Sequence, residues 1–231
     1  MGRRSSVAKG GGRMRSSGRM HRTQIPRLVT GVVLLALVIA GCDPIGSAPS
    51  SSASTAAGKP TLLWPRPPDQ MARTVAAGLE PEVNEHLEYH VHAHLDVFVD
   101  GQPIVVPAGI GINIDDPEVK HFESPVAYGG ITQCAAPCIS PLHTHAESGI
   151  LHTESATPTP NTLGQLFDEW GVALSRTCVG ELCDKPIAFY INGTAYTGDP
   201  RAIELADRRA IAVVIGRPPA VIPVTADFSQ D

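Results

Sequence analysis

The stretch His86–Gly101, HLEYHVHAHLDVFVDG, decides the fold because apolar and polar side chains alternate along it. From residue 89 to residue 99 the odd positions carry Tyr, Val, Ala, Leu, Val and Val, and the even positions carry His90, His92, His94, Asp96 and Phe98. A period of two is typical of a β-strand, whose successive side chains point to opposite faces of a sheet. The pattern therefore predicts a strand over residues 89–99, with the odd positions toward the core and three histidines on the other face.

Turn and capping signals along the rest of the chain predict further hairpins and a helix. Asp100-Gly101 and Asn192-Gly193 each follow a strand-like run, and such pairs favour two-residue hairpin turns. Thr162 and Gln165 fit a capping box, and apolar residues at helical spacing follow it. We expect an α+β, β-dominated domain, built as a small sandwich or partly open barrel of short strands and hairpins with one packed helix.

The N-terminal segment resembles a bacterial lipoprotein signal. Eight Lys and Arg residues without an acidic residue precede an apolar run at 28–40, which ends in Ile39-Ala40-Gly41-Cys42. This run is too short for a comfortable membrane span. Small residues before a cysteine resemble the lipobox, in which that cysteine becomes the lipidated first residue of the mature protein. The resemblance implies a signal peptide over residues 1–41 and lipidation of Cys42, whereas a buried cysteine in an ordinary apolar helix is the alternative.

Composition divides the remaining chain into three parts. Residues 42–80 begin with a Ser/Ala/Gly/Pro tract without apolar period, which predicts a flexible tether. Residues 81–222 would form the domain, and residues 223–231 a C-terminal tail.

Ten Lys and Arg remain after Cys42 against 23 Asp and Glu, a net charge of −13. An acidic chain repels phosphate backbones, which argues against nucleic acid as a partner.

The cysteines beyond Cys42 number four, and they are Cys134, Cys138, Cys178 and Cys183. An even number in an exported chain indicates two disulfides. The short spacings favour the pairs 134–138 and 178–183 among the three possible connectivities. A cysteine-ligated zinc site is the alternative, although CxxxC and CxxxxC differ from the usual CxxC spacing.

Histidines are grouped along the predicted strands in a way that suits a metal site. Six of them form three groups: His90, His92 and His94; His143 and His145; and His152. Side chains two positions apart on a strand lie about 6.5–7 Å apart on one face, so that imidazoles can converge on an ion. The pattern predicts a transition metal ion, Cu or Zn, shared by all six, with Asp96 and Glu154 as outer ligands or as partners for ring N–H groups. We expect His86 and His121 to be ordinary surface residues.

Three functions fit these features. The first is a lipid-anchored extracytoplasmic metal-binding protein, held on the outer face of the cytoplasmic membrane for metal acquisition, buffering or delivery. The second is a metalloenzyme with an open coordination position. Gly149 stands where a cupin-type ligand set needs its glutamate, and the chain has no GxSxG, P-loop or HExxH motif, which argues against an enzyme. The third is a metal-free surface interaction module, and the sequence indicates no particular protein partner.

Four segments resemble an uncharacterised family of exported bacterial and archaeal proteins. They are YHVHAHLDVFVDGQPIVVPAGIGI, PLHTHAESGILHTES, TLGQLFDEWG and YINGTAYTGDPRAI, and the resemblance covers most of Glu88 to Gly216. In that family an acidic residue often follows the second histidine of HTH, whereas Ala146 takes this place here and Glu147 comes next. The resemblance implies a folded domain and no particular activity.

Overall fold

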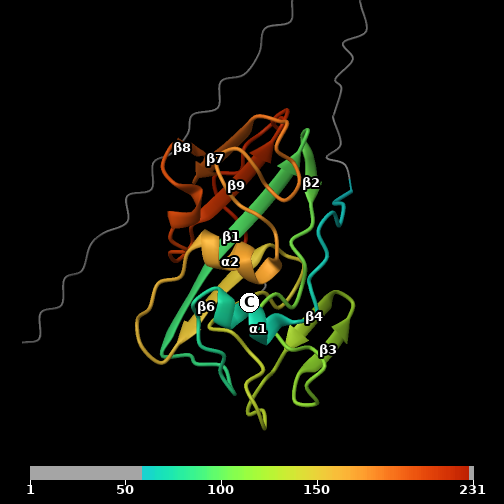
Figure 1. The fold of residues 1–231 in the computed structure, drawn as a ribbon, viewed down its shortest axis with the longest axis vertical. Helices are drawn as coiled ribbons and strands as arrows, with labels where there is room; N and C mark the ends of the chain where they lie inside the picture. Colours follow the sequence, from blue (N-terminus) through green and yellow to red (C-terminus); the bar gives the residue numbers. More distant parts are fainter. Residues whose placement is uncertain (1–58, 229–231) are drawn as a thin grey trace, which may run out of the picture. The chain divides into compact units, whose positions relative to one another are not determined.

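The computed structural model describes residues 59–228, and a mixed sheet of seven strands runs through this part of the chain. The strands are β1 (Tyr89–Val99), β2 (Gln102–Ile104), β5 (Leu142–His143), β6 (Ile150–Ser155), β7 (Ile187–Ile191), β8 (Thr194–Tyr196) and β9 (Ala210–Ile215). Their order is β5-β6-β1-β9-β7-β8, with β2 paired to β1. Only the β1–β9 pair is parallel among the strand pairs of the described sheet, and β1 lies at its centre (Figure 1).

Strand β1 has the predicted division of its faces. Ala93, Leu95 and Val97 are each 1% exposed, while the even positions between them are partly exposed. Both predicted hairpin turns are also present, with positive φ angles at Asp100 and Gly101 and again at Asn192 and Gly193. Two successive positive φ angles are what a type I′ turn requires. The period of two therefore predicted both the strand and the side that faces the core.

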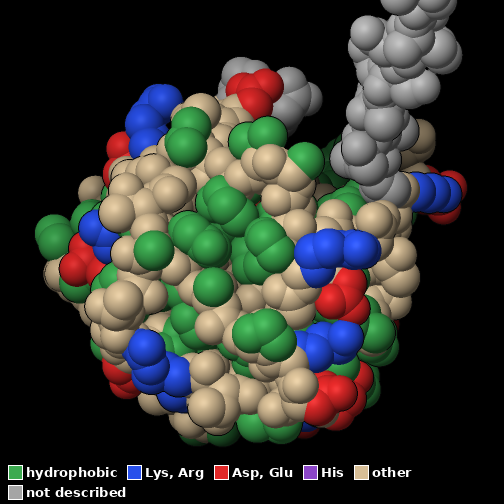
Figure 2. Space-filling model, turned by 90° about the horizontal axis from the view of Figure 1, so that it is seen from above, with side chains coloured by type: hydrophobic (Ala, Val, Ile, Leu, Met, Phe, Trp, Pro, Cys, Tyr) green, Lys and Arg blue, Asp and Glu red, His purple; other side chains and the backbone are tan. Residues whose placement is uncertain are grey.

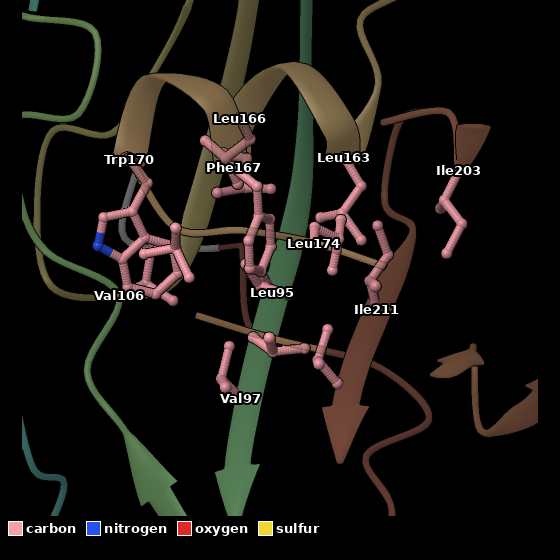
Figure 3. Packing of buried hydrophobic residues seen from close by; sticks show 14 of the residues in the cluster. Leu95, Val97, Val106, Leu163, Leu166, Phe167, Trp170, Leu174, Ile203 and Ile211 are labelled. Carbon is pink, nitrogen blue, oxygen red and sulfur yellow. The ribbon is translucent and has the colours of Figure 1, made fainter. Parts of the chain in front are cut away.

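Helix α2 (Leu163–Trp170) covers the apolar face of the sheet. The predicted capping box is formed, since Thr162 Oγ1 accepts from the Gln165 N–H at 3.4 Å and Gln165 Oε1 accepts from the Thr162 N–H at 2.9 Å. The helix ends at Gly171, whose φ of 72° lies in the left-handed region that favours glycine. Figure 3 shows side chains of the helix above those of β1 and β9, with Leu163, Leu166, Phe167 and Trp170 on one side and Leu95, Val97 and Ile211 on the other.

The sequence predicts that the folded domain begins at residue 81, but in the structure residues before it already pack into the core. Trp64 is 8% exposed, its ring packs edge-on against Trp170 at 5.9 Å, and its carbonyl accepts from Trp170 Nε1 at 2.9 Å. Helix α1 (Gln70–Ala76) follows and packs against α2. This helix was not predicted from the sequence, because the segment TLLWPRPPD before it contains several prolines and shows no apolar period.

A second, two-stranded sheet lies in a region where the sequence shows no strand pattern. It consists of β3 (Lys120–Glu123) and β4 (Val126–Gly129). A small separate core, which includes Cys134, Cys138 and Ile139, lies next to it in the chain. Near the other end, a short helix η1 (Pro200–Ala202) precedes β9. The α+β class is confirmed, and the sheet does not close into a barrel within residues 59–228.

The cysteines form the two predicted local pairs, Cys134–Cys138 and Cys178–Cys183. Disulfides persist in oxidising compartments, so both pairs fit an extracytoplasmic location. Within the described part of the chain, no helix is long and apolar enough to cross a membrane. The predicted signal peptide, Cys42 and the first part of the tether lie outside the described residues.

Candidate metal centre

Strand register brings three of the histidines into one row across the sheet. His92 on β1 lies opposite His152 on β6, and His152 lies opposite His143 on β5. Residues paired in this way point to the same face, with Cβ atoms about 4.5–5.5 Å apart. In the neighbouring row His90 lies opposite Glu154. Two rows on three adjacent strands thus place four imidazoles and a carboxylate on the face opposite to helix α2.

His145 joins this group from outside the sheet. It lies two residues beyond the end of β5 and is held by β4, since the Tyr128 N–H donates to the His145 carbonyl at 2.9 Å. The His145 ring in turn donates from Nδ1 to the Tyr128 carbonyl at 2.6 Å. These two contacts bring His145 Nε2 to 3.2 Å from His143 Nε2.

Candidate ligand atoms form two overlapping groups, within each of which all atoms lie less than 4.8 Å apart. The first group, called here the inner group, consists of His143, His145, His152 and Glu154. The second, called here the outer group, consists of His90, His92 and His152. The inner group is mostly buried, whereas His90 is exposed. His152 belongs to both.

Backbone carbonyls fix the tautomers of His143 and His145. His143 Nδ1 lies 2.9 Å from the Ser140 carbonyl, as His145 Nδ1 lies 2.6 Å from that of Tyr128. Because a carbonyl oxygen can only accept, each neutral ring carries its proton on Nδ1 and a lone pair on Nε2. The two Nε2 lone pairs face each other across 3.2 Å. Two nitrogens bound tetrahedrally to one ion at about 2.0–2.1 Å would be about 3.3 Å apart, so this spacing suits a shared cation.

Protonation of His143 would remove the repulsion between the two lone pairs, but it would cost free energy. The side chain is completely buried, and burial, followed by the charge of His145, holds the pKa of His143 well below its ordinary value. The charge of Glu154 acts in the opposite direction but does not reverse the result. A neutral His143 is the form that binds a metal ion.

Gly111 allows the chain to approach His143 closely. A Cβ atom at Gly111 would lie 2.3 Å from the Leu142 carbonyl oxygen and 3.0 Å from His143 Cβ, and its φ of +73° also favours glycine. The Ser140 N–H donates to the Gly111 carbonyl at 2.7 Å. This contact fixes Ser140, whose own carbonyl orients the His143 ring.

Glu154 supplies negative charge at the centre of the cluster. Burial alone would raise its pKa, but a hydrogen bond with His152 and the charges of the surrounding histidines outweigh burial and lower the pKa of Glu154 to about 2. Its Oε1 lies 3.0 Å from His90 Nε2, 3.2 Å from His152 Nδ1 and 3.7 Å from His143 Nε2. Its Oε2 is buried without a hydrogen-bond partner among the described residues. Burying a carboxylate oxygen without a hydrogen-bond partner costs free energy, and a bound metal ion would satisfy this oxygen.

A cavity of about 600 Å³ opens onto the cluster. Its polar wall includes Glu85, whose Oε1 lies 4.0 Å from His145 Nε2. Burial, followed by the charge of Glu154, raises the pKa of Glu85. Sequence reasoning missed this residue, and its only sequence signal is its place beside His86. The remaining wall is largely apolar and includes Leu87, Val126 and Ala127.

His94 and Asp96 share the face of β1 with the cluster but are not gathered into either group. His94 lies opposite Ile150, so its row offers no further ligand. Its Nδ1 lies 3.3 Å from Asp96 Oδ2, and its Nε2 lies 3.0 Å from the Ser148 carbonyl. Burial lowers the pKa of His94, but the contacts with Asp96 and Ser148 outweigh burial and raise it. Glu154, expected as an outer ligand or as a partner for ring N–H groups, lies 3.2 Å from His152 Nδ1 and also belongs to the inner group.

The cluster lies near the end of the sheet where β1 begins. Figure 2 views the described domain from above, toward the end where β1 finishes, and apolar, basic and acidic side chains are mixed on that face without a visible histidine.

Comparisons with protein-family models, with curated proteins and with solved structures gave no match to this chain.

Proposed function

We propose that this domain is an extracytoplasmic metal-binding protein that takes up Cu²⁺ or Zn²⁺ through its histidine cluster. The observation that carries the proposal is the pair of Nε2 atoms of His143 and His145, which face each other at 3.2 Å with both Nδ1 atoms bound to carbonyls. The buried carboxylate of Glu154 adds an anionic ligand beside them. Imidazole nitrogen suits both metals, and Cu²⁺ binds the more tightly to nitrogen sites in general.

The cellular setting of the proposal is the bacterial cell envelope. Two disulfides fit an oxidising compartment. The lipobox resemblance at residues 39–42 supports lipidation of Cys42, and the Ser/Ala/Gly/Pro tract after it supports a tether. Metal acquisition, buffering or delivery at the outer face of the cytoplasmic membrane would suit a domain held there.

Titration calorimetry on the full chain, purified in detergent because of its apolar N-terminal segment, tests metal binding. The double variant His92→Ala/His145→Ala removes one ligand from each group and is expected to weaken Cu²⁺ and Zn²⁺ binding at least a hundredfold. His94→Ala is the matched control, since this histidine lies on the same strand but outside both groups. Equal affinities of the wild type and the double variant would refute the proposal.

Lipid anchoring is tested separately by the variant Cys42→Ser. Expressed in a bacterium, the wild type is expected in the detergent phase after partitioning, because its acyl chains hold it there. The variant is expected in the aqueous phase or as unprocessed precursor. Labelling with a radioactive fatty acid should mark the wild type alone, and a labelled variant would show that Cys42 is not the modified residue.

A metalloenzyme is the second candidate function, and the cavity of about 600 Å³ favours it. The cavity would leave a metal ion accessible to a small molecule, as catalytic metal sites require. Binding of azide to the Cu²⁺-loaded protein, seen as a new absorption band, would show an open coordination position. Turnover of a substrate would then distinguish the enzyme from a carrier.

A further inference from the structure

We propose that the histidine cluster binds two transition metal ions, one in the inner group and one in the outer group. The proposal rests on the proposed metal binding and extends it from one ion to a pair. Its basis is the division of the ligand atoms into two groups that have only His152 in common.

A single ion cannot serve both groups as they stand. Ligand atoms on one ion with bonds of about 2.1 Å are at most about 4.2 Å apart. The five histidines and Glu154 do not form a single group even within 4.8 Å, and they separate into the inner and outer groups instead. Each group offers a close pair of imidazole nitrogens, with Nε2 atoms 3.2 Å apart for His143 and His145 and 2.7 Å apart for His90 and His92.

Glu154 lies between the two pairs. Its Oε1 is 3.0 Å from His90 Nε2 in the outer group and 3.7 Å from His143 Nε2 in the inner group. A carboxylate has two oxygens, and Oε2 of Glu154 has no hydrogen-bond partner among the described residues. One carboxylate can therefore bind both ions of a pair, which in two-metal sites lie about 3.5–4 Å apart.

His152 also lies between the pairs. The centre of its ring is 4.5 Å from the ring centre of His92 and equally 4.5 Å from that of His145. Its two ring nitrogens point in different directions. The ring can thus contribute to either ion, and it holds both ion positions close to Glu154.

Surrounding acidic groups suit the charge of two divalent ions. Besides Glu154, the cavity wall contains Glu85 and Glu147, and Glu85 lies beside His145. No Lys or Arg lines the cavity within the described part of the chain. Opposite charge nearby stabilises the bound ions, while a cation in the wall would have opposed the second one.

Metal stoichiometry tests the proposal. The full chain in detergent is loaded with excess Cu²⁺, desalted and analysed for metal and protein content. We expect two equivalents in the wild type, one in His90→Ala/His92→Ala and two in the control His94→Ala. Two Cu²⁺ ions at such a separation interact magnetically, so the wild type should show a weakened, coupled electron paramagnetic resonance signal, and the double variant should regain the signal of an isolated ion.

The outcomes separate this proposal from the proposed function. One equivalent in the wild type, with an uncoupled signal, would overturn the two-ion site and leave metal binding intact. No bound metal in the wild type would remove both proposals. Two equivalents in the double variant, or none while circular dichroism shows it folded, would show that His90 and His92 do not hold a separate ion and would equally overturn the proposal.

Discussion

Saturating Zn²⁺ or Cu²⁺ is expected to raise the melting temperature of the domain by roughly 10 °C. An ion that binds only the folded state at about 1,000 times its dissociation constant stabilises the fold by about 4 kcal/mol. In chains of this size each kcal/mol shifts the melting temperature by about 2–4 °C. Differential scanning calorimetry of the full chain, with and without metal, measures the shift.

The variant Glu154→Gln is expected to lose more than half of this shift. Glutamine keeps the size of the side chain but replaces the central anion with a neutral amide. The matched control is Glu88→Gln, since Glu88 is well exposed and belongs to neither ligand group. An identical shift in both variants would show that Glu154 is not a ligand.

The variant Glu169→Gln is expected to become more stable than the wild type as the pH rises from 5 to 8. Glu169 on α2 is completely buried, and burial raises its pKa from 4.5 to about 8 despite hydrogen bonds with Ser140 and Thr74. Its Oε1 lies 2.8 Å from Thr74 Oγ1, which also lies 3.1 Å from the Gln70 carbonyl oxygen. A protonated Glu169 can donate from Oε1 to Thr74 while Thr74 donates to the Gln70 carbonyl, so both of these contacts are hydrogen bonds in the neutral form.

The direction of this effect follows from proton binding. Below about pH 4.5 Glu169 is protonated in both the folded and the unfolded chain, and its contribution to stability is fully present. As the pH rises toward 8 the unfolded chain releases a proton that the folded chain keeps, so the free energy of unfolding falls. The loss at pH 8 is on the order of 3–5 kcal/mol.

Urea denaturation at pH 5 and pH 8 measures this loss. EDTA is added so that metal binding makes no contribution to stability. Glutamine does not titrate, so the difference in stability between variant and wild type should grow in favour of Glu169→Gln. Glu118→Gln, at an exposed glutamate, is the control and should follow the wild type. A constant difference across this pH range would show that Glu169 is ionised in the fold.

Much of the central strand and its role could be predicted from the sequence. The alternation around Leu95 gave the orientation of β1, and turn residues such as Asp100-Gly101 gave its hairpin. Such features can be predicted from the sequence, because the direction of a side chain and the backbone φ angle depend on the residue itself and on its near neighbours. The same is true of the capping box at Thr162.

The composition of the candidate metal centre depends on contacts between distant segments. The period of two places His94 on the same face as His90 and His92, but only the register with β6 shows that Ile150 stands opposite His94. The approach of His145 depends on β4, a short strand without a sequence pattern. Glu85 precedes β1 and reaches the cavity through a loop, so no periodicity could assign it.

The row of His92, His152 and His143 would make the proposed metal binding depend on the order in which the strands pair. His92 lies far in sequence from His143 and His152, so the row is complete only after β1 and β6 have paired in the correct register, in addition to the more local pairing of β5 with β6. Pairing of distant segments is a slow step in folding, because the chain loses the entropy of loop closure before the stabilising contacts form. A slip of one residue would send a strand's side chains to the opposite face. Under the proposed function, an ion would therefore bind only after these strands have paired, and its retention would report that the pairing is correct.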